Sequence, residues 1–259
     1  MAVQAQGLSP RLVRMMREYR CDLHIHTCLS PCADLDMHPR SLVERAVARG
    51  LDIIAVCDHN ASENVGYVIR AAENKTLTVV PGMEITSQEE VHVVALFGRL
   101  RDLEKIQDVV YDNLPGQNDE KLFGTQAIVN ENGEVEGFNE RLLIGATRIP
   151  LSDLVGRIHE LGGIAIASHI DRESFSVISQ LGFVDSESGF DALEVSRALG
   201  IAGGRQRYPE LSAYPFVTSS DAHFIDDIGT GVTRMRLGGA TVEEVKMACE
   251  GRDGRSICG

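Results

Sequence analysis

The chain has 259 residues, of which 43% are hydrophobic and 24% charged, a composition typical of globular domains. Its formal net charge of −13 argues against binding long nucleic acid, which requires a basic surface. No apolar run is long enough to span a membrane, and the N-terminus lacks the apolar core of a signal peptide. The six cysteines form no paired framework, so we expect reduced thiols in a cytoplasmic protein.

The first third of the chain alternates helix and strand patterns, and polar residues follow the strands. Ser9-Pro10 predicts the start of an N-terminal helix over residues 9–19, with the serine as N-cap. The expected elements that follow are strand 21–25, helix 39–49, strand 52–57, helix 63–73 and strand 77–80. Polar residues at the carboxyl ends of such strands are typical of active sites in parallel α/β barrels.

The middle of the chain departs from this alternation. Residues 91–97 predict another apolar strand, but His92 near its start leaves the direction of that strand open. A helical pattern over 102–112 is followed by a stretch without helix periodicity, in which Asn132-Gly133 predicts a hairpin. We therefore expect residues 113–149 to be an insertion that lies over the site.

The last third returns to short apolar strands and helices, and the tail is expected to be frayed. The expected elements are a helix capped by Ser152, strand 164–167, helix 174–181, strands 192–195, 216–218 and 232–237, and a helix from Thr241 to Glu250.

The polar residues next to these strands share one chemistry. His24 and His26 leave a strand on the same face because strand side chains alternate. The full set is His24, His26, His59, Glu84, His92, His169, Asp221 and His223. It holds six of the eight histidines, and imidazole combined with carboxylate suits zinc, manganese or iron.

These residues lie in five motifs, which are Asp22-Leu23-His24-Ile25-His26, Asp58-His59, Gly82-Met83-Glu84 with His92, Ser168-His169 and Ser220-Asp221-Ala222-His223. In order and spacing the motifs resemble the polymerase and histidinol phosphatase (PHP) superfamily, and in particular its small stand-alone bacterial proteins. The resemblance implies a single domain over residues 1–259, folded as a distorted (β/α)7 barrel, with two or three divalent metal ions.

The resemblance also implies a ligand assignment, which is His24, His26, Glu84 and Asp221 for one metal, Glu84, His92 and His169 for a second, and His59 and His223 for a third. Many family members place an aspartate directly after the serine of the loop that completes the third site, but here Ser30 is followed by Pro31. We expect Asp34 to take that role, with Asp36 and Cys32 as the alternatives.

The implied activity is a metal-dependent phosphoesterase in which a metal-activated hydroxide attacks a small phosphate ester, such as a nucleotide, a sugar phosphate or an amino-alcohol phosphate. Asp221 and His223 are candidates for moving protons. Arg172 and Arg197 each follow a strand end, where either one would clamp a phosphate or form a surface salt bridge. We expect Asp58 to orient a ligating imidazole rather than to bind metal.

Two other functions stay open on the sequence. A related metal hydrolase would act on a non-phosphate bond, because a fold does not fix its reaction. A metal-stabilised regulatory or docking module would catalyse no reaction. The remaining histidines have simpler interpretations, since His38 precedes a helix as a cap and His159 lies on a helix surface.

Overall fold

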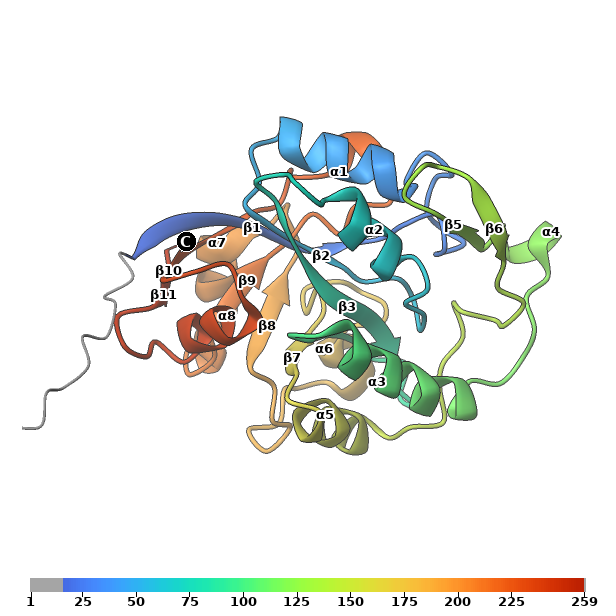
Figure 1. Cartoon of the computed structure of the whole chain (residues 1–259). Helices are drawn as coiled ribbons and strands as arrows, with labels where there is room; N and C mark the ends of the chain where they lie inside the picture. The colour runs from blue at the N-terminus through green and yellow to red at the C-terminus, as the bar shows by residue number, and fades with distance from the viewer. Residues whose placement is uncertain (1–15, 259) are drawn as a thin grey trace, which may run out of the picture.

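The computed structural model describes residues 16–258 and contains one large sheet, a separate hairpin and helices packed around the sheet (Figure 1). The strands are β1 (Arg17–Ile25), β2 (Ile53–Val56), β3 (Thr78–Thr86), β4 (His92–Leu96), β5 (Ala127–Val129), β6 (Val135–Phe138), β7 (Ile164–Ala167), β8 (Ala192–Val195), β9 (Phe216–Thr218), β10 (Thr233–Leu237) and β11 (Ser256–Ile257). The helices are α1 (Pro39–Ala48), α2 (Val65–Ala71), α3 (Leu100–Asn113), α4 (Glu120–Phe123), α5 (Leu151–Glu160), α6 (Val177–Leu181), α7 (Gly200–Arg207) and α8 (Val242–Cys249), with 3-10 turns at Pro209–Leu211 and Ile225–Asp227.

The large sheet has nine strands in the order β11-β10-β1-β2-β3-β4-β7-β8-β9. The pairs β1–β2, β2–β3, β7–β8 and β8–β9 are parallel. Strand β4 runs antiparallel to both β3 and β7. This settles the strand direction that the sequence left open because of His92. Because β4 is reversed, its first residue lies at the edge where the parallel strands end.

The two ends of the sheet nearly meet, so the fold is a distorted α/β barrel as the resemblance implied. Ile25 of β1 forms a parallel bridge with Ala222, which follows β9. The buried carboxylate of Asp22 accepts the backbone N–H of Ser220 and that of Gly229, each at 2.9 Å. These contacts hold the segment after β9 against the end of β1.

The core explains why the central strands read as continuous apolar runs. In β2, Ile53 belongs to a buried cluster that includes α8, whereas Ile54 packs in the larger cluster beneath the other helices. Val93 and Val94 of β4 divide in the same way. Both faces of these strands are therefore buried among apolar side chains, so polar residues are not favoured on either face. None of the helices within residues 16–258 is both long and apolar enough to cross a bilayer.

The insertion forms the predicted hairpin. Strands β5 and β6 pair antiparallel around Asn132-Gly133, and with α4 they stand out to one side of the barrel (Figure 1). The buried side chain of Asn64 donates to Ala127 O at 3.0 Å and accepts from Val129 N at 2.9 Å. This side chain fixes β5 against the start of α2.

Several local predictions differ from the structure. The predicted helix 9–19 lies partly outside the described residues, and Arg17–Tyr19 belong to β1, because pairing with β10 extends that strand. Pro150 rather than Ser152 precedes α5. Helices α4 and α7 were not expected, and part of the tail, β11, pairs with β10 instead of fraying. Strand β3 continues to Thr86 because β4 pairs along its second half.

Candidate metal centre

The polar residues predicted from the motifs come together at one end of the barrel. His24 and His26 end β1 with fully buried side chains, and their Nε2 atoms lie 3.2 Å apart. Glu84 projects from β3, and His92 begins the reversed strand β4 beside it. His59, His169, Asp221 and His223 lie in the loops that follow β2, β7 and β9. Reversing β4 thus brings its first residue to the same site as the residues that follow parallel strands.

Glu84 is the centre of this arrangement. Its carboxylate oxygens lie within 3.5 Å of ring nitrogens from five histidines, which are His92 at 3.0 Å, His59 at 3.1 Å, His169 at 3.3 Å, His24 at 3.4 Å and His26 at 3.5 Å. The glutamate is 1% exposed. A single buried carboxylate is therefore within reach of all three groups of predicted ligands, as a bridging role requires.

Asp221 forms a second focus beside Glu84. Its Oδ1 lies 3.1 Å from His26 Nε2 and 3.5 Å from His24 Nε2, and its Oδ2 lies 2.5 Å from Arg172 Nη2. Asp221 has a φ of 48°, in the left-handed region that non-glycine residues rarely adopt. His169 also has a positive φ, of 27°. Such backbone conformations are maintained where the surrounding structure over-determines them, as it does here.

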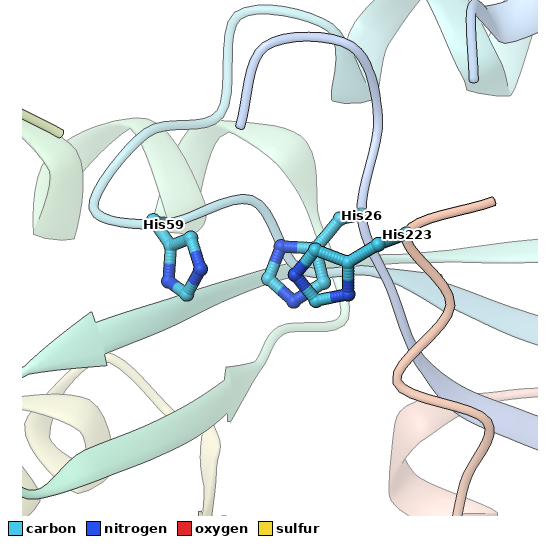
Figure 2. A group of neighbouring side chains, drawn as sticks. All are labelled: His26, His59 and His223. Carbon is cyan, nitrogen blue, oxygen red and sulfur yellow. The ribbon is translucent and has the colours of Figure 1, made fainter. Parts of the chain in front are cut away.

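A third group consists of histidines that the chain contributes from three separate segments. Figure 2 shows the imidazoles of His26, His59 and His223, and one ring nitrogen of each lies within 4.8 Å of the others. The rings of His26 and His223 stack with centroids 4.1 Å apart. The thiol of Cys32 forms hydrogen bonds with His59 and His223.

The donor atoms fit a metal cluster because many of them are buried without a hydrogen bond. The atoms concerned within the cluster are His59 Nδ1, Glu84 Oε1, His92 Nδ1 and His169 Nδ1. Leaving a buried polar atom without a partner costs about 1–3 kcal/mol. Several such atoms next to one another are explained if divalent cations are their partners, and three groups of these residues have the spacing for one.

The electrostatics keep the two carboxylates ionised. Burial by itself would raise the pKa of Glu84, but the charges of His92 and His24 outweigh it and hold that pKa well below its usual range. Burial opposes ionisation of Asp221 as well, and again the nearby His24 and His26 lower its pKa well below the ordinary value. Both side chains are therefore present as anions at neutral pH, the form that binds metal.

Two further carboxylates support the histidines. Glu194 of β8 is 2% exposed, and its Oε2 lies 3.0 Å from His24 Nδ1. Asp58 accepts the hydroxyl of Ser30 at 2.7 Å, and Ser30 Oγ lies 2.9 Å from His26 Nδ1. Asp58 thus reaches an imidazole through a serine. Glu194 was missed in the sequence, although a glutamate inside the apolar strand 192–195 is the signal that would have found it.

The structure does not bring Asp34 to the cluster. Its exposed side chain accepts the backbone N–H of Asp36 at 2.9 Å, while its own N–H donates to His223 O at 2.9 Å. The loop therefore turns the Asp34 carboxylate away from the histidines, and Asp36 is exposed as well. Of the three alternatives for this position, Cys32 is the one whose side chain contacts predicted ligands, namely His59 and His223.

The two arginines have different surroundings. Arg172 lies beside Asp221 with 46% of its side chain exposed, whereas Arg197 donates to Asp227 Oδ1 at 2.8 Å. A cavity of about 260 Å³ is lined by the metal-centre residues together with Arg172, Ile144 and Phe175. A second cavity, of about 290 Å³, is lined by both Arg172 and Arg197. Substrate thus has access to the centre beside Arg172.

Comparison with known proteins identifies the family. The family model described as PHP domain matches residues 22–182, which is more than half of the chain. The chain belongs to the PHP domain family. A second model, described as PHP-associated, matches residues 206–250. The family resemblance predicted from the motifs is therefore confirmed.

Individual relatives act on different substrates. The chain is 33% identical over 85 residues to a 5'-3' exoribonuclease from Haemophilus influenzae, a match that covers 32% of this chain and 29% of that protein. The lesion-specific endonuclease PfuEndoQ from Pyrococcus furiosus has a TM-score of 0.73 at 17% identity, over 93% of this chain and 58% of that one. A protein from Bifidobacterium adolescentis, named as a candidate metal-dependent phosphoesterase, has a TM-score of 0.51 at 21% identity, over 78% and 87% of the two chains. The chain spans less than two thirds of the length of the curated relatives that it matches.

Proposed function

We propose that this protein is a metal-dependent phosphoesterase that hydrolyses a small phosphate ester. The observation that carries the proposal is the buried Glu84 carboxylate surrounded by five imidazoles, next to a cavity that an arginine also lines. Hydrolysis of a phosphate ester needs cations that bind phosphoryl oxygens and a base for water, and such a set of donors supplies the site for both.

The residues that would hold the metals are His24, His26, His59, Glu84, His92, His169, Asp221 and His223. When bound, divalent metals supply an activated water and neutralise charge on the phosphoryl group. Zinc, manganese and iron all suit this mixture of imidazole and carboxylate.

Arg172 is the residue that we assign to the phosphate. Its guanidinium lies 2.5 Å from Asp221 Oδ2 and lines both cavities, with part of its donor set free for a ligand. Arg197 is a weaker candidate for this role, because its Nη1 already donates hydrogen bonds to Asp227 and Thr230. His223 is assigned to metal binding rather than to proton transfer, because its Nδ1 lies 2.9 Å from Asp221 O and only Nε2 remains as a donor atom.

A second candidate substrate is the end of a nucleic-acid strand. The Pyrococcus furiosus endonuclease resembles 93% of this chain with 58% of its own length, and a structure of Endonuclease Q in complex with a 27-mer duplex substrate resembles this chain to a similar extent. This likeness weighs against the exclusion of nucleic acid that the net charge of −13 suggested. The small cavities beside Arg172 favour a substrate that enters by one phosphorylated end.

The test is release of inorganic phosphate by manganese-loaded protein from a panel of nucleotides, sugar phosphates, amino-alcohol phosphates and 5'-phosphorylated oligonucleotides. Asp221→Asn is the matched control because it preserves shape and removes a charge. We expect release by the wild type from at least one small ester and little by the variant.

The other outcomes select among the alternatives. Shortening of oligonucleotides without hydrolysis of small esters would move the substrate to nucleic acid. Turnover of amides or lactones alone would indicate a hydrolase of non-phosphate bonds. Bound metal without turnover of any substrate would overturn the phosphoesterase proposal and favour a docking module.

A further inference from the structure

The loop after β1 places a cysteine where the resemblance led us to expect an aspartate. Cys32 is exposed, and its thiol forms hydrogen bonds with both His59 and His223. These two imidazoles come from loops far apart in the sequence, and one ring nitrogen of each lies within 4.8 Å of the other. A thiolate and two imidazoles at such spacing are the donors of a common type of transition-metal site.

Backbone contacts hold this loop in place. Ala33 N donates to Ser30 O at 3.0 Å, and Asp34 N donates to His223 O at 2.9 Å. The buried hydroxyl of Ser30 is in turn held by Asp58. Cys32 therefore lies between two fixed points and stays beside the histidines.

A second observation points to a ligand at the same place. His26 is fully buried and His59 is 6% exposed, so neither imidazole obtains its partners from bulk water. One ring nitrogen from each of His26, His59 and His223 lies within 4.8 Å of the others, which is the spacing of ligands around a single metal ion.

We propose that Cys32 supplies a thiolate ligand to a third divalent metal, which His59 and His223 also hold. The inference rests on the proposed metal centre and names a ligand that differs from the carboxylate expected at this position. A thiolate ligand favours zinc or iron over manganese or magnesium at this one position, because soft metals prefer sulfur. The site with Cys32 is thus expected to differ in metal preference from the sites that Glu84 and the other histidines would form.

Spectroscopy of the metal-loaded full chain tests this ligand without measuring turnover. Cobalt(II) bound to a thiolate has a near-ultraviolet charge-transfer band that imidazole and carboxylate ligands do not produce. We expect this band in the wild type, in Asp34→Asn and in Cys258→Ser, which removes an exposed thiol elsewhere. Cys32→Ser should lose the band and bind less metal, while the ligand-field bands of the other sites remain.

Two further measurements make the result decisive. X-ray absorption of the zinc-loaded wild type should show a sulfur neighbour at about 2.3 Å, which Cys32→Ser lacks. Cys32→His should restore metal content without the sulfur signal, which separates loss of a ligand from damage to the loop.

Failure of this inference is distinguishable from failure of the proposed function. Absence of the band from cobalt-loaded wild type, or its persistence in Cys32→Ser, would overturn the role of Cys32 and leave phosphate release unaffected. Loss of metal in Asp34→Asn instead would assign the position to the carboxylate. A wild type that shows the band and hydrolyses no phosphate ester would retain the Cys32 ligand and reject the phosphoesterase.

Discussion

Five imidazoles surround the buried carboxylate of Glu84. A substitution that removes its charge and keeps its size tests whether the charge is needed to bind metal. Glu84→Gln keeps the volume and removes the negative charge that we propose bridges the metals. We expect metal content and phosphate release to fall together, with activity lower by more than about 100-fold, because a bridging ligand acts on more than one metal. Elemental analysis and a phosphate assay check this, and unchanged occupancy and turnover would contradict the bridging role.

Glu194 acts on the metal centre indirectly, because its Oε2 lies 3.0 Å from Nδ1 of the predicted ligand His24. Glu194→Gln weakens the partner that fixes the tautomer and orientation of this imidazole. We expect metal affinity to fall about 10–100-fold while the fold is retained. Competition with a chromogenic chelator measures the affinity, and Glu210→Gln at an exposed position is the matched control. Equal affinity in both variants would show that His24 needs no such partner.

At the scale of elements, Asp22 joins β1 to the segment after β9 through Ser220 and Gly229. Burial raises the pKa of Asp22 to about 6, and the two backbone N–H groups only partly offset it. In the unfolded chain an aspartate has a pKa of about 3.9. The stabilisation from the neutral form is therefore complete below pH about 4 and lost as the pH rises through about 6.

Asp22→Asn removes this titration and keeps the side chain. We expect the difference in unfolding free energy, wild type minus variant, to decrease by about 2 kcal/mol from pH 4 to pH 7. Urea unfolding of metal-free protein at several pH values measures it. A difference that is constant across this range would mean that the pKa of Asp22 is not raised in the folded chain.

For the whole molecule, bound metal should stabilise the fold, because its ligands come from both halves of the barrel. Metal at 100 times its dissociation constant adds about 2.7 kcal/mol, which corresponds to roughly 5–10 °C in Tm for a domain of this size. Thermal unfolding with metal and with a chelator checks this, and Asp221→Asn should show a smaller shift. Equal Tm values in both conditions would indicate that the centre binds no metal in the folded state.

The sequence by itself determined the alternation of strands and helices and the residues that gather at one end, and its motifs implied the barrel through their resemblance to a known family. It did so because apolar runs, helix caps and the residues just past each strand are local features, and parallel strands bring their carboxyl ends to one edge. The Asn132-Gly133 hairpin is also local, since that pair specifies its own turn.

Only the tertiary structure decided the features that depend on long-range pairing. The reversed direction of β4 follows from its pairing with both β3 and β7, and the extension of β1 over Arg17–Tyr19 follows from its pairing with β10. The partnership of Glu194 with His24 joins residues 170 positions apart. Whether Asp34 or Cys32 faces His59 depended on how one loop turns, and no local pattern records that turn because its backbone contacts reach across to His223.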